Sequence, residues 1–339
     1  MTTSARERVK FYQVGSFAVG NRLLPLEVRS VQADPDRTNA LTSGHRACQG
    51  CGEALAARYV VDAAMRAADE QLVVVNATGC LEVFSTPYPE TAWRVPWLHS
   101  LFGNAPAVAA GVAAAMRARG RTDVRVLGQG GDGGTVDIGF GALSGMFERN
   151  DDVLYVCYDN EGYMNTGVQR SGATPQGAST QTTPVAGGVP GNEPGGVKDV
   201  PRIAMAHEIP YVATATVADL QDLEAKVARA MTFRGARYLH VLVPCPLGWG
   251  SASSDTIRIA RAATQSGLFP VFEAERGEVT GVLPLRHQVP VVDYLRLQKR
   301  FAHLLTDENR HVVDELQRRA DRNIARYGLL GDLGKDATS

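Results

Sequence analysis

The chain carries short, mostly apolar runs that recur at intervals along its length. They are QLVVVN (71–76), VRVLG (124–128), VLYVCY (153–158) and YLHVLV (238–243). Apolar residues follow one another in these runs and do not alternate with polar ones, which is the pattern of a strand buried on both faces. The runs therefore predict strands of a parallel sheet that is covered on both sides.

Between these runs lie segments rich in alanine, leucine and charged residues, which favour helix. They are residues 53–70, 105–120, 140–150 and 219–233. Strands that alternate with helices are typical of α/β proteins. We therefore expect an open, mostly parallel sheet with helices on both faces.

Two segments fall outside this alternation. Residues 165–197 are dense in Gly, Pro, Ser and Thr and are longer than a usual connection, so we expect them to be disordered or ordered by a ligand or partner. Near the C-terminus, Thr306 is the expected cap of a docking helix whose first turn carries Asp307 and Glu308. The apolar stripe of that helix would be Val313, Leu316, Ala320 and Ile324.

Length and charge limit the classes of function. A chain of 339 residues with 44% hydrophobic content can bury a full core. Its 35 basic and 36 acidic residues nearly cancel, which argues against nucleic acid or an anionic membrane surface as a partner. The N-terminus lacks the apolar core of a secretory signal and no run is long enough to span a bilayer, so we expect a cytoplasmic protein.

Four chemically capable residues come just after the four predicted strands. Cys80, Asp132, Asn160 and Cys245 follow the successive runs in that order. In open α/β sheets, ligands collect in the crevice beyond the carboxyl ends of the strands. We therefore expect these four side chains along one edge of the sheet.

The stretch GQGGDGG (128–134) places an aspartate among glycines. Glycines such as Gly131, Gly133 and Gly134 permit positive φ and let backbone amides approach a phosphate, but Asp132 would repel that phosphate. Mg²⁺ between them resolves the conflict, because it takes carboxylate, carbonyl and phosphate oxygens. Asn160 would add a side-chain oxygen and Gly162 a backbone one. The alternative is a glycine-rich turn that Asp132 merely caps.

Several motifs, taken together and in this order, resemble a known family. They are GHRACQGCGE, ATGCLEVF, GDGGTVDIG, YDNEGYMNTGVQRS and CPLGW. The GDGG stretch and the later asparagine loop look like a thiamine diphosphate motif, and the whole set resembles the β subunit of pyruvate:ferredoxin oxidoreductases and related 2-oxoacid:ferredoxin oxidoreductases. The resemblance runs from about residue 40 to residue 330.

The resemblance implies roles for individual residues. Asp132, Asn160 and the carbonyl of Gly162 would bind Mg²⁺, and Asn165 would contact the reacting centre. The residues around thiamine diphosphate would be Gly131, Gly133, Gly134, Glu53 and Cys80, although Glu53 has a capping or salt-bridge role as its alternative. The ligands of a [4Fe–4S] cluster would be Cys48, Cys51, Cys80 and Cys245. A structural zinc ion would use the same four thiolates, and Cys157, inside a strand, is left over as a buried hydrophobe.

The implied activity is oxidative decarboxylation of pyruvate, with coenzyme A taking the acyl group and electrons passing through the cluster to ferredoxin, or the reverse. Other 2-oxo acids are alternative substrates: 2-oxoisovalerate, an aromatic 2-oxo acid, 2-oxoglutarate or oxalate. A non-catalytic iron–sulfur electron-transfer subunit is an alternative of another class.

The implied site is incomplete, because this chain lacks a recognisable pyrimidine-binding domain with its activating glutamate. An α subunit would supply that domain. The complex would also contain γ and ferredoxin-like δ subunits or domains. Residues 165–197 and the C-terminal helix are the expected partner contacts. The implied division is an N-terminal extension (1–40), a domain that binds the diphosphate half of the cofactor and the cluster (41–285), and a C-terminal helical extension (286–339).

Overall fold

The computed structural model describes residues 39–87, 90–193, 196–285 and 287–330, together with the backbone of 11–14 and 17–20. The chain separates into two units, Met1–Asn39 and Ala40–Ser339. In the first unit, β1 (Phe11–Val14) and β2 (Phe17–Gly20) form an antiparallel pair. The division at residues 285 and 286 stays a prediction.

Eight strands of the second unit form one sheet in the order β12-β11-β9-β10-β6-β5-β3-β4. The pairs from β9 to β4 are parallel, and β11 and β12 add an antiparallel edge. The expected mostly parallel sheet is confirmed. The strands are β3 (Leu72–Ala77), β4 (Trp97–Ser100), β5 (Arg125–Gly131), β6 (Val153–Asp159), β9 (Tyr211–Thr216), β10 (Arg237–Leu242), β11 (Phe272–Glu275) and β12 (Glu278–Val282).

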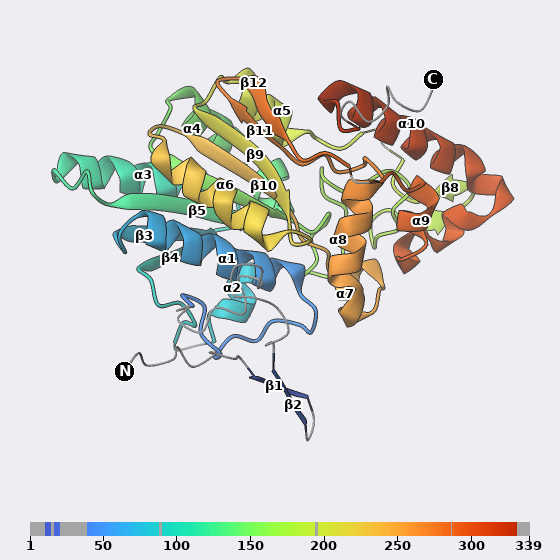
Figure 1. The fold of residues 1–339 in the computed structure, drawn as a ribbon, viewed down its shortest axis with the longest axis horizontal. Helices are drawn as coiled ribbons and strands as arrows, with labels where there is room; N and C mark the ends of the chain where they lie inside the picture. The colour runs from blue at the N-terminus through green and yellow to red at the C-terminus, as the bar shows by residue number, and fades with distance from the viewer. Residues whose placement is uncertain are drawn as a thin grey trace, which may run out of the picture. The chain divides into compact units, whose positions relative to one another are not determined.

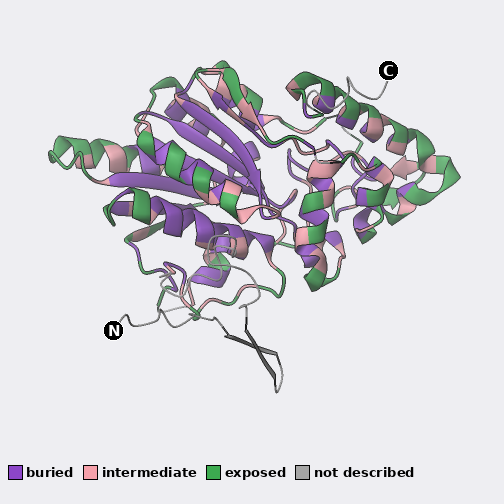
Figure 2. Cartoon of the chain, viewed as in Figure 1, coloured by how far each residue is buried: buried purple, intermediate pink, exposed green. Residues whose placement is uncertain are grey.

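The central strands are buried on both faces, as their continuous apolar sequences predict (Figure 2). Along β6, the side chains of Val153, Tyr155 and Cys157 join one core cluster with residues of α3, α4 and α5. The alternate residues of β6 are also buried, and α1 and α6 lie side by side on the other face of the sheet (Figure 1). Helices therefore cover both faces of the sheet.

Four of the helices lie close to the predicted segments, and further helices follow in the C-terminal region. In the described part of the chain, none is long and apolar enough to cross a membrane. They are α1 (Gly52–Ala67), α2 (Cys80–Ser85), α3 (Ala105–Ala118), α4 (Phe140–Glu148), α5 (Val200–Ala206), α6 (Leu220–Thr232), α7 (Pro246–Trp249), α8 (Thr256–Gln265), α9 (Val291–Leu295) and α10 (Arg310–Tyr327).

The C-terminal helix exists but begins later than predicted. Thr306 does not cap it: the Thr306 hydroxyl donates to the carbonyl of His303, and a 3₁₀ turn at Asp307–Asn309 precedes α10. The fully buried residue of its first turn is Val312, whereas Val313 packs only partly. The helix docks on α8, α9 and the end of β10 through a second core that includes Leu316 and Ala320.

The described part of 165–197 is held by contacts within the chain, which neither prediction for this segment anticipated. Ser171, Thr174 and Asn192 are buried, and the Asn192 amide donates to the carbonyl of Thr174 at 2.8 Å. A short antiparallel pair, β7 (Val185–Ala186) and β8 (Val189–Pro190), projects from the segment. The composition of this segment disfavours the backbone hydrogen bonds of regular secondary structure. Hydrogen bonds from polar side chains to the backbone of the segment take their place.

Candidate functional site

The four predicted strand ends meet at one edge of the sheet. The strands β3, β5, β6 and β10 are parallel neighbours, so their carboxyl ends point the same way. Asp132 directly follows β5 and Asn160 directly follows β6. Cys80 opens α2 after β3, and Cys245 precedes α7 after β10.

A cavity at this edge brings together the residues that the sequence assigned to the cofactor and to Mg²⁺. Thr78, Phe102, Tyr163 and Met164, which the sequence analysis did not single out, also line it. The anticipated residues on its wall are Glu53, Cys80, Gly131, Asp132, Gly133, Gly134, Asn160, Gly162 and Asn165.

Three oxygen-bearing groups converge in this cavity. One terminal atom of the Asn160 amide lies 2.8 Å from the carbonyl oxygen of Gly162 and 3.1 Å from Oδ1 of Asp132. When the amide oxygen of Asn160 is the atom that faces Gly162 and Asp132, its amide nitrogen faces Oε2 of Glu53 at 3.4 Å. In an octahedral Mg²⁺ site with bonds of ~2.1 Å, adjacent ligands lie ~3.0 Å apart. The spacing fits a magnesium ion if the amide oxygen occupies this place, and it fits two hydrogen bonds if the amide nitrogen occupies it.

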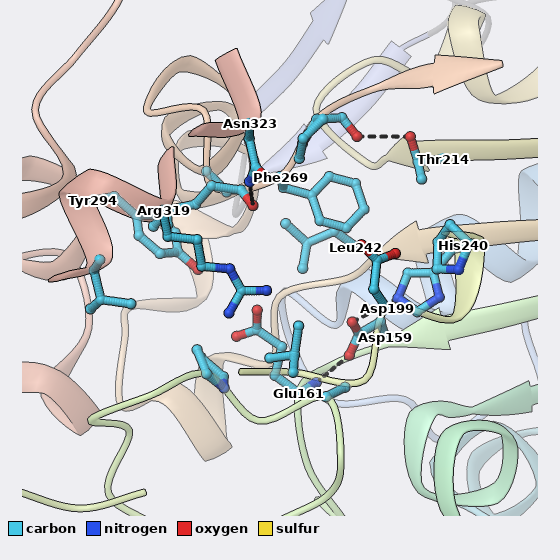
Figure 3. Close-up of a pocket in the computed structure, with 18 of the residues that line it drawn as sticks. Asp159, Glu161, Asp199, Thr214, His240, Leu242, Phe269, Tyr294, Arg319 and Asn323 are labelled. Carbon is cyan, nitrogen blue, oxygen red and sulfur yellow. Dashed lines mark hydrogen bonds and ion pairs between the residues drawn. The ribbon is translucent and has the colours of Figure 1, made fainter. Parts of the chain in front are cut away.

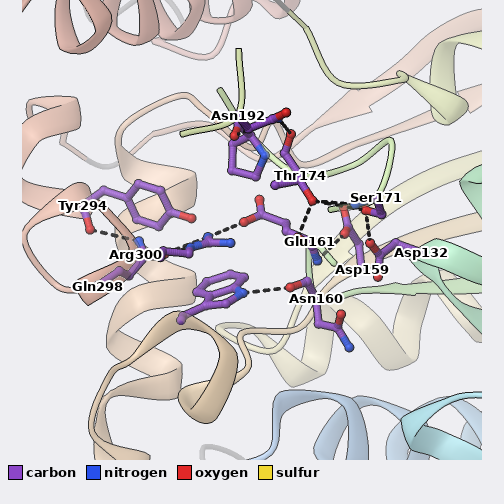
Figure 4. A network of polar contacts seen from close by, with 12 residues as sticks. Asp132, Asp159, Asn160, Glu161, Ser171, Thr174, Asn192, Tyr294, Gln298 and Arg300 are labelled. Carbon is purple, nitrogen blue, oxygen red and sulfur yellow. Dashed lines mark hydrogen bonds and ion pairs between the residues drawn. The ribbon is translucent and has the colours of Figure 1, made fainter. Parts of the chain in front are cut away.

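Asp132 is oriented by a residue from the long loop. The Ser171 hydroxyl donates to Oδ2 of Asp132 at 2.5 Å, which leaves Oδ1 for the converging group (Figure 4). Asp132 makes no side-chain capping bond to the following turn, so the alternative of a mere turn cap is wrong. Burial raises the pKa of Asp132 well above its ordinary value, and the neighbouring Asp159 raises it further. A cation would offset this clustering of carboxyl groups.

The positive φ that glycine permits is not used around Asp132, and close packing accounts for glycine at positions 133 and 134. Gly131 ends β5, while Gly133 and Gly134 begin a π-helical turn (Gly133–Asp137), and none of the three has positive φ. A Cβ on Gly133 would lie 2.5 Å from the ring of Tyr163, and one on Gly134 would lie 2.9 Å from the backbone of Phe102. A side chain at either position would collide with the cavity wall.

Tyr163 and Ser171 are the polar contacts that sequence reasoning missed. The Tyr163 hydroxyl lies 3.2 Å from the carbonyl oxygen of Gly133 and 3.1 Å from Oδ2 of Asp137, and its ring stacks on Phe102. Both residues lie in irregular segments, where side-chain periodicity carries no information. Their presence within the YDNEGYMNTGVQRS stretch was the one available signal.

Glu53 lies in the first turn of α1 and points into the same cavity. It is 3% exposed, and burial raises its pKa to about 8, although the hydrogen bond from Asn160 opposes the shift. A position at a helix N-terminus normally stabilises the charged form of a carboxyl group. Here loss of water outweighs that effect, so folding shifts Glu53 toward its protonated form.

The four predicted cluster cysteines are brought together by the packing of two loops. Gly50 has a φ of 72°, and a Cβ there would lie 2.2 Å from the carbonyl oxygen of Ser253. The amide of Gly52 donates to Pro244, and the hydroxyl of Thr256 donates to Gly50. These bonds tie the Cys48–Cys51 loop to the segment after β10, which carries Cys245.

Several of these thiols lie at helix N-termini. Cys51 caps α1 and Cys245 caps α7, each accepting a backbone N–H at 3.4 Å. Burial, and then the charges of Glu53 and Cys245, raise the pKa of Cys51 to about 12. Burial also raises the pKa of Cys80, and the charges of Glu53 and of the other three cysteines raise this pKa further. Bound iron or zinc would supply the missing positive charge.

In the described part of the chain, no group of three or more His, Cys, Asp or Glu side chains is arranged to hold a single metal ion. A tetrahedral zinc site, with Zn–S bonds of about 2.3 Å, brings its sulfurs within about 3.8 Å of one another. Cys157 is fully buried in the middle of β6, away from the cavity wall. The four remaining cysteines are the ligands that either a zinc ion or an iron–sulfur cluster would use.

Comparison with known proteins identifies the family. The subunit PorB of pyruvate synthase from Methanosarcina barkeri is 50% identical over 291 residues, which cover 85% of this chain and 97% of that protein. The chain belongs to the PorB family. PorB of Methanocaldococcus jannaschii is 45% identical over 300 residues, covering 86% of this chain and 98% of that protein.

Two further comparisons bear on this PorB-family chain. The profile of the family described as "Thiamine pyrophosphate enzyme, C-terminal TPP binding domain" matches residues 77–241, the part that carries Asp132 and Asn160. The ketoisovalerate oxidoreductase subunit VorB of Pyrococcus abyssi is 39% identical over 287 residues, covering 81% of this chain and 91% of that protein. Relatives named for different 2-oxo acids therefore share most of this chain.

Proposed function

We propose that this chain is the thiamine diphosphate-binding β subunit of a 2-oxoacid:ferredoxin oxidoreductase with pyruvate as its substrate. The observation that carries the proposal is the single cavity in which residues from the ends of β3, β5 and β6 meet. Cys80 belongs both to that wall and to the cysteine set, so the cofactor and an electron acceptor would be neighbours. Membership of the PorB family supports pyruvate.

Mg²⁺ would be held by Asp132, Asn160 and the carbonyl of Gly162. The spacing of their oxygen positions and the raised pKa of Asp132 support this assignment. Ser171 would fix the rotamer of Asp132, and Glu53 would fix the orientation of the Asn160 amide. The diphosphate would lie against Gly131, Gly133 and Gly134, where no side chain stands in the way.

A [4Fe–4S] cluster would be held by Cys48, Cys51, Cys80 and Cys245. Their mutual effects on pKa support their proximity. A cluster also suits the chemistry, because zinc cannot take up electrons. Electrons would leave through Cys80 toward ferredoxin.

Bound thiamine diphosphate supplies the carbanion chemistry that releases CO₂ from a 2-oxo acid. The chain's own residues orient the reactants: Asn165, on the cavity wall, would contact the reacting centre. Phe102 and Met164 on the same wall would exclude water. Coenzyme A would accept the acyl group, and the same groups serve the reverse reaction.

A partner must complete the site. Glu53 is the one glutamate among the described residues of the wall, and it is engaged with Asn160 on the magnesium side. The glutamate that activates the aminopyrimidine would therefore come from an α subunit with a pyrimidine-binding domain, alongside γ and δ subunits. Leu101 and Ile138, 73% and 66% exposed beside the cavity residue Phe102, form an apolar surface suited to such a partner.

The test is the activity of the complex purified after coexpression with its neighbouring subunits. Reduction of a low-potential dye is measured anaerobically with coenzyme A and a panel of 2-oxo acids. We expect the highest kcat/KM with pyruvate. Suppose that the complex has its full iron and thiamine content but that none of the tested 2-oxo acids supports dye reduction. That result would instead favour the non-catalytic electron-transfer subunit.

A further inference from the structure

A second cavity, of about 120 Å³, lies on the other side of the segment that follows β6 (Figure 3). Asp159 and Glu161 line this second cavity, whereas Asn160 and Gly162 line the cofactor cavity. The two walls share no residue among those described. Alternate residues of one short segment thus separate two distinct cavities.

The inner wall of the second cavity is mainly apolar. It combines residues from β10, α9, α10 and the loop before β11, namely Leu242, Leu268, Phe269, Leu295 and Leu316. Most of these residues belong to the core beneath α10. Ligand sites are typically concave and apolar with a few well-placed polar groups.

Arg319 of α10 supplies such a group. Its guanidinium points into the cavity, above the carboxyl group of Glu161 (Figure 3). Arg319 makes no hydrogen bond or ion pair with any residue in the described part of the chain. Burial lowers the pKa of Arg319, and Asp199 and then Glu161 only partly offset this effect from a distance. The N–H donors of Arg319 are therefore available to an acceptor on a ligand.

The carboxyl groups on the wall are already engaged elsewhere. Asp159 accepts from His240 at 2.8 Å, and Glu161 is paired with Arg300. Asp199 caps α5 by accepting from the amide of Arg202 at 3.2 Å. The cavity therefore offers the N–H donors of Arg319, which have no hydrogen-bond partner among the described residues, beside an apolar surface.

We propose that this second cavity binds a small carboxylate that carries an apolar chain. The carboxylate accepts charge-assisted hydrogen bonds from Arg319, and the chain lies against Leu242, Phe269 and Leu316. The site is separate from the cofactor cavity, so such a ligand occupies it while the cofactor is bound.

Hexanoate is the probe for this site, with hexan-1-ol and hexylammonium as ligands of the same chain and a different head group. Binding to the full chain is measured by isothermal titration calorimetry. We expect hexanoate to bind at one site per chain and at least about tenfold more tightly than hexan-1-ol, and hexylammonium not to bind. Equal affinities for the three ligands would overturn the proposal.

The matched variants are Arg319→Met and Arg318→Met. Arg318 is the adjacent residue of α10, is exposed, and lines neither cavity. We expect Arg319→Met to weaken hexanoate binding at least about tenfold and Arg318→Met to leave it unchanged. Hexanoate binding that survives Arg319→Met would contradict the assignment. The head-group series on the unmodified chain decides the question even if Arg319→Met proves unstable.

Discussion

At the scale of single residues, the cofactor cavity concentrates carboxyl groups that water does not reach. Asp132 is 1% exposed and Glu53 is 3% exposed, and burial raises the pKa of both. Each is held by one neutral donor, Ser171 for Asp132 and Asn160 for Glu53. The site is thus built to receive positive charge, and its stability without ligands should depend on pH.

Glu53→Gln tests this pH dependence in the cofactor-free chain. The pKa of Glu53 rises from 4.5 to about 8 on folding, so the folded chain keeps a proton that the unfolded chain loses. The free energy of unfolding should therefore fall as pH rises between these values, and the glutamine variant should lack that part of the slope. Urea unfolding across this pH range measures it, with exposed Glu148→Gln as the control. Parallel curves for wild type and Glu53→Gln would contradict the account.

Ser171→Ala tests how Asp132 is oriented. Loss of the hydroxyl removes a hydrogen bond to a carboxylate, a type worth about 1.5–3 kcal/mol, so the affinity of the complex for Mg²⁺–thiamine diphosphate should fall about tenfold or more. Ser179→Ala is the control, because the Ser179 hydroxyl has no hydrogen bond among the described residues of the same loop. Calorimetric titration compares the two, and equal affinities would show that Ser171 does not position Asp132.

Cysteine variants separate the cluster ligands from the leftover thiol. Cys245→Ser and Cys80→Ser should lower the iron content of anaerobically purified complex, because each would remove a thiolate ligand of the proposed cluster. Cys157→Ser should keep full iron, since Cys157 is buried within β6. Metal analysis decides between them. Stoichiometric zinc without iron in the wild-type complex would overturn the cluster assignment.

At the scale of elements, the glycine turn after β5 determines where the cavity wall lies. Gly133→Ala would place its Cβ 2.5 Å from Tyr163, whereas Gly131→Ala meets nothing closer than 3.9 Å. We expect the first to cost about 1–3 kcal/mol of stability and to weaken cofactor binding, and the second to change stability by about 0.5 kcal/mol or less. Thermal unfolding and cofactor titration measure both. Equal effects would mean that packing against Tyr163 is not the reason for glycine.

The sequence predicted the elements that carry a continuous pattern and missed those that do not. Apolar runs located β3, β5, β6 and β10, and hence the edge where Asp132 and Asn160 meet. The strand β9, YVATAT, escaped because small and polar residues interrupt its apolar character, and β4 escaped because it is short and half exposed. The Thr306 cap failed because a 3₁₀ turn intervenes before α10. Ser171 and Tyr163 reach the site from loops, where no periodicity exists.

At the scale of the whole molecule, one side of the 159–162 segment faces the cofactor cavity and the other faces the cavity of Arg319. The apolar face of α10 is used within the chain, which leaves its polar face outward. Leu101 and Ile138, by contrast, are large apolar side chains that are mostly exposed. We propose that a second subunit completes the cofactor site of this PorB-family chain.

The most direct measurement of the central claim is the electron paramagnetic resonance signal of the reduced cluster in the purified complex after anaerobic addition of pyruvate and coenzyme A. The account predicts that the signal appears with the wild-type complex. In a complex with Asp132→Ala it should be absent with pyruvate and yet appear with dithionite, because that variant loses the cofactor and keeps the cysteines. A wild-type cluster that dithionite reduces, but that pyruvate with coenzyme A leaves oxidised, would contradict the account.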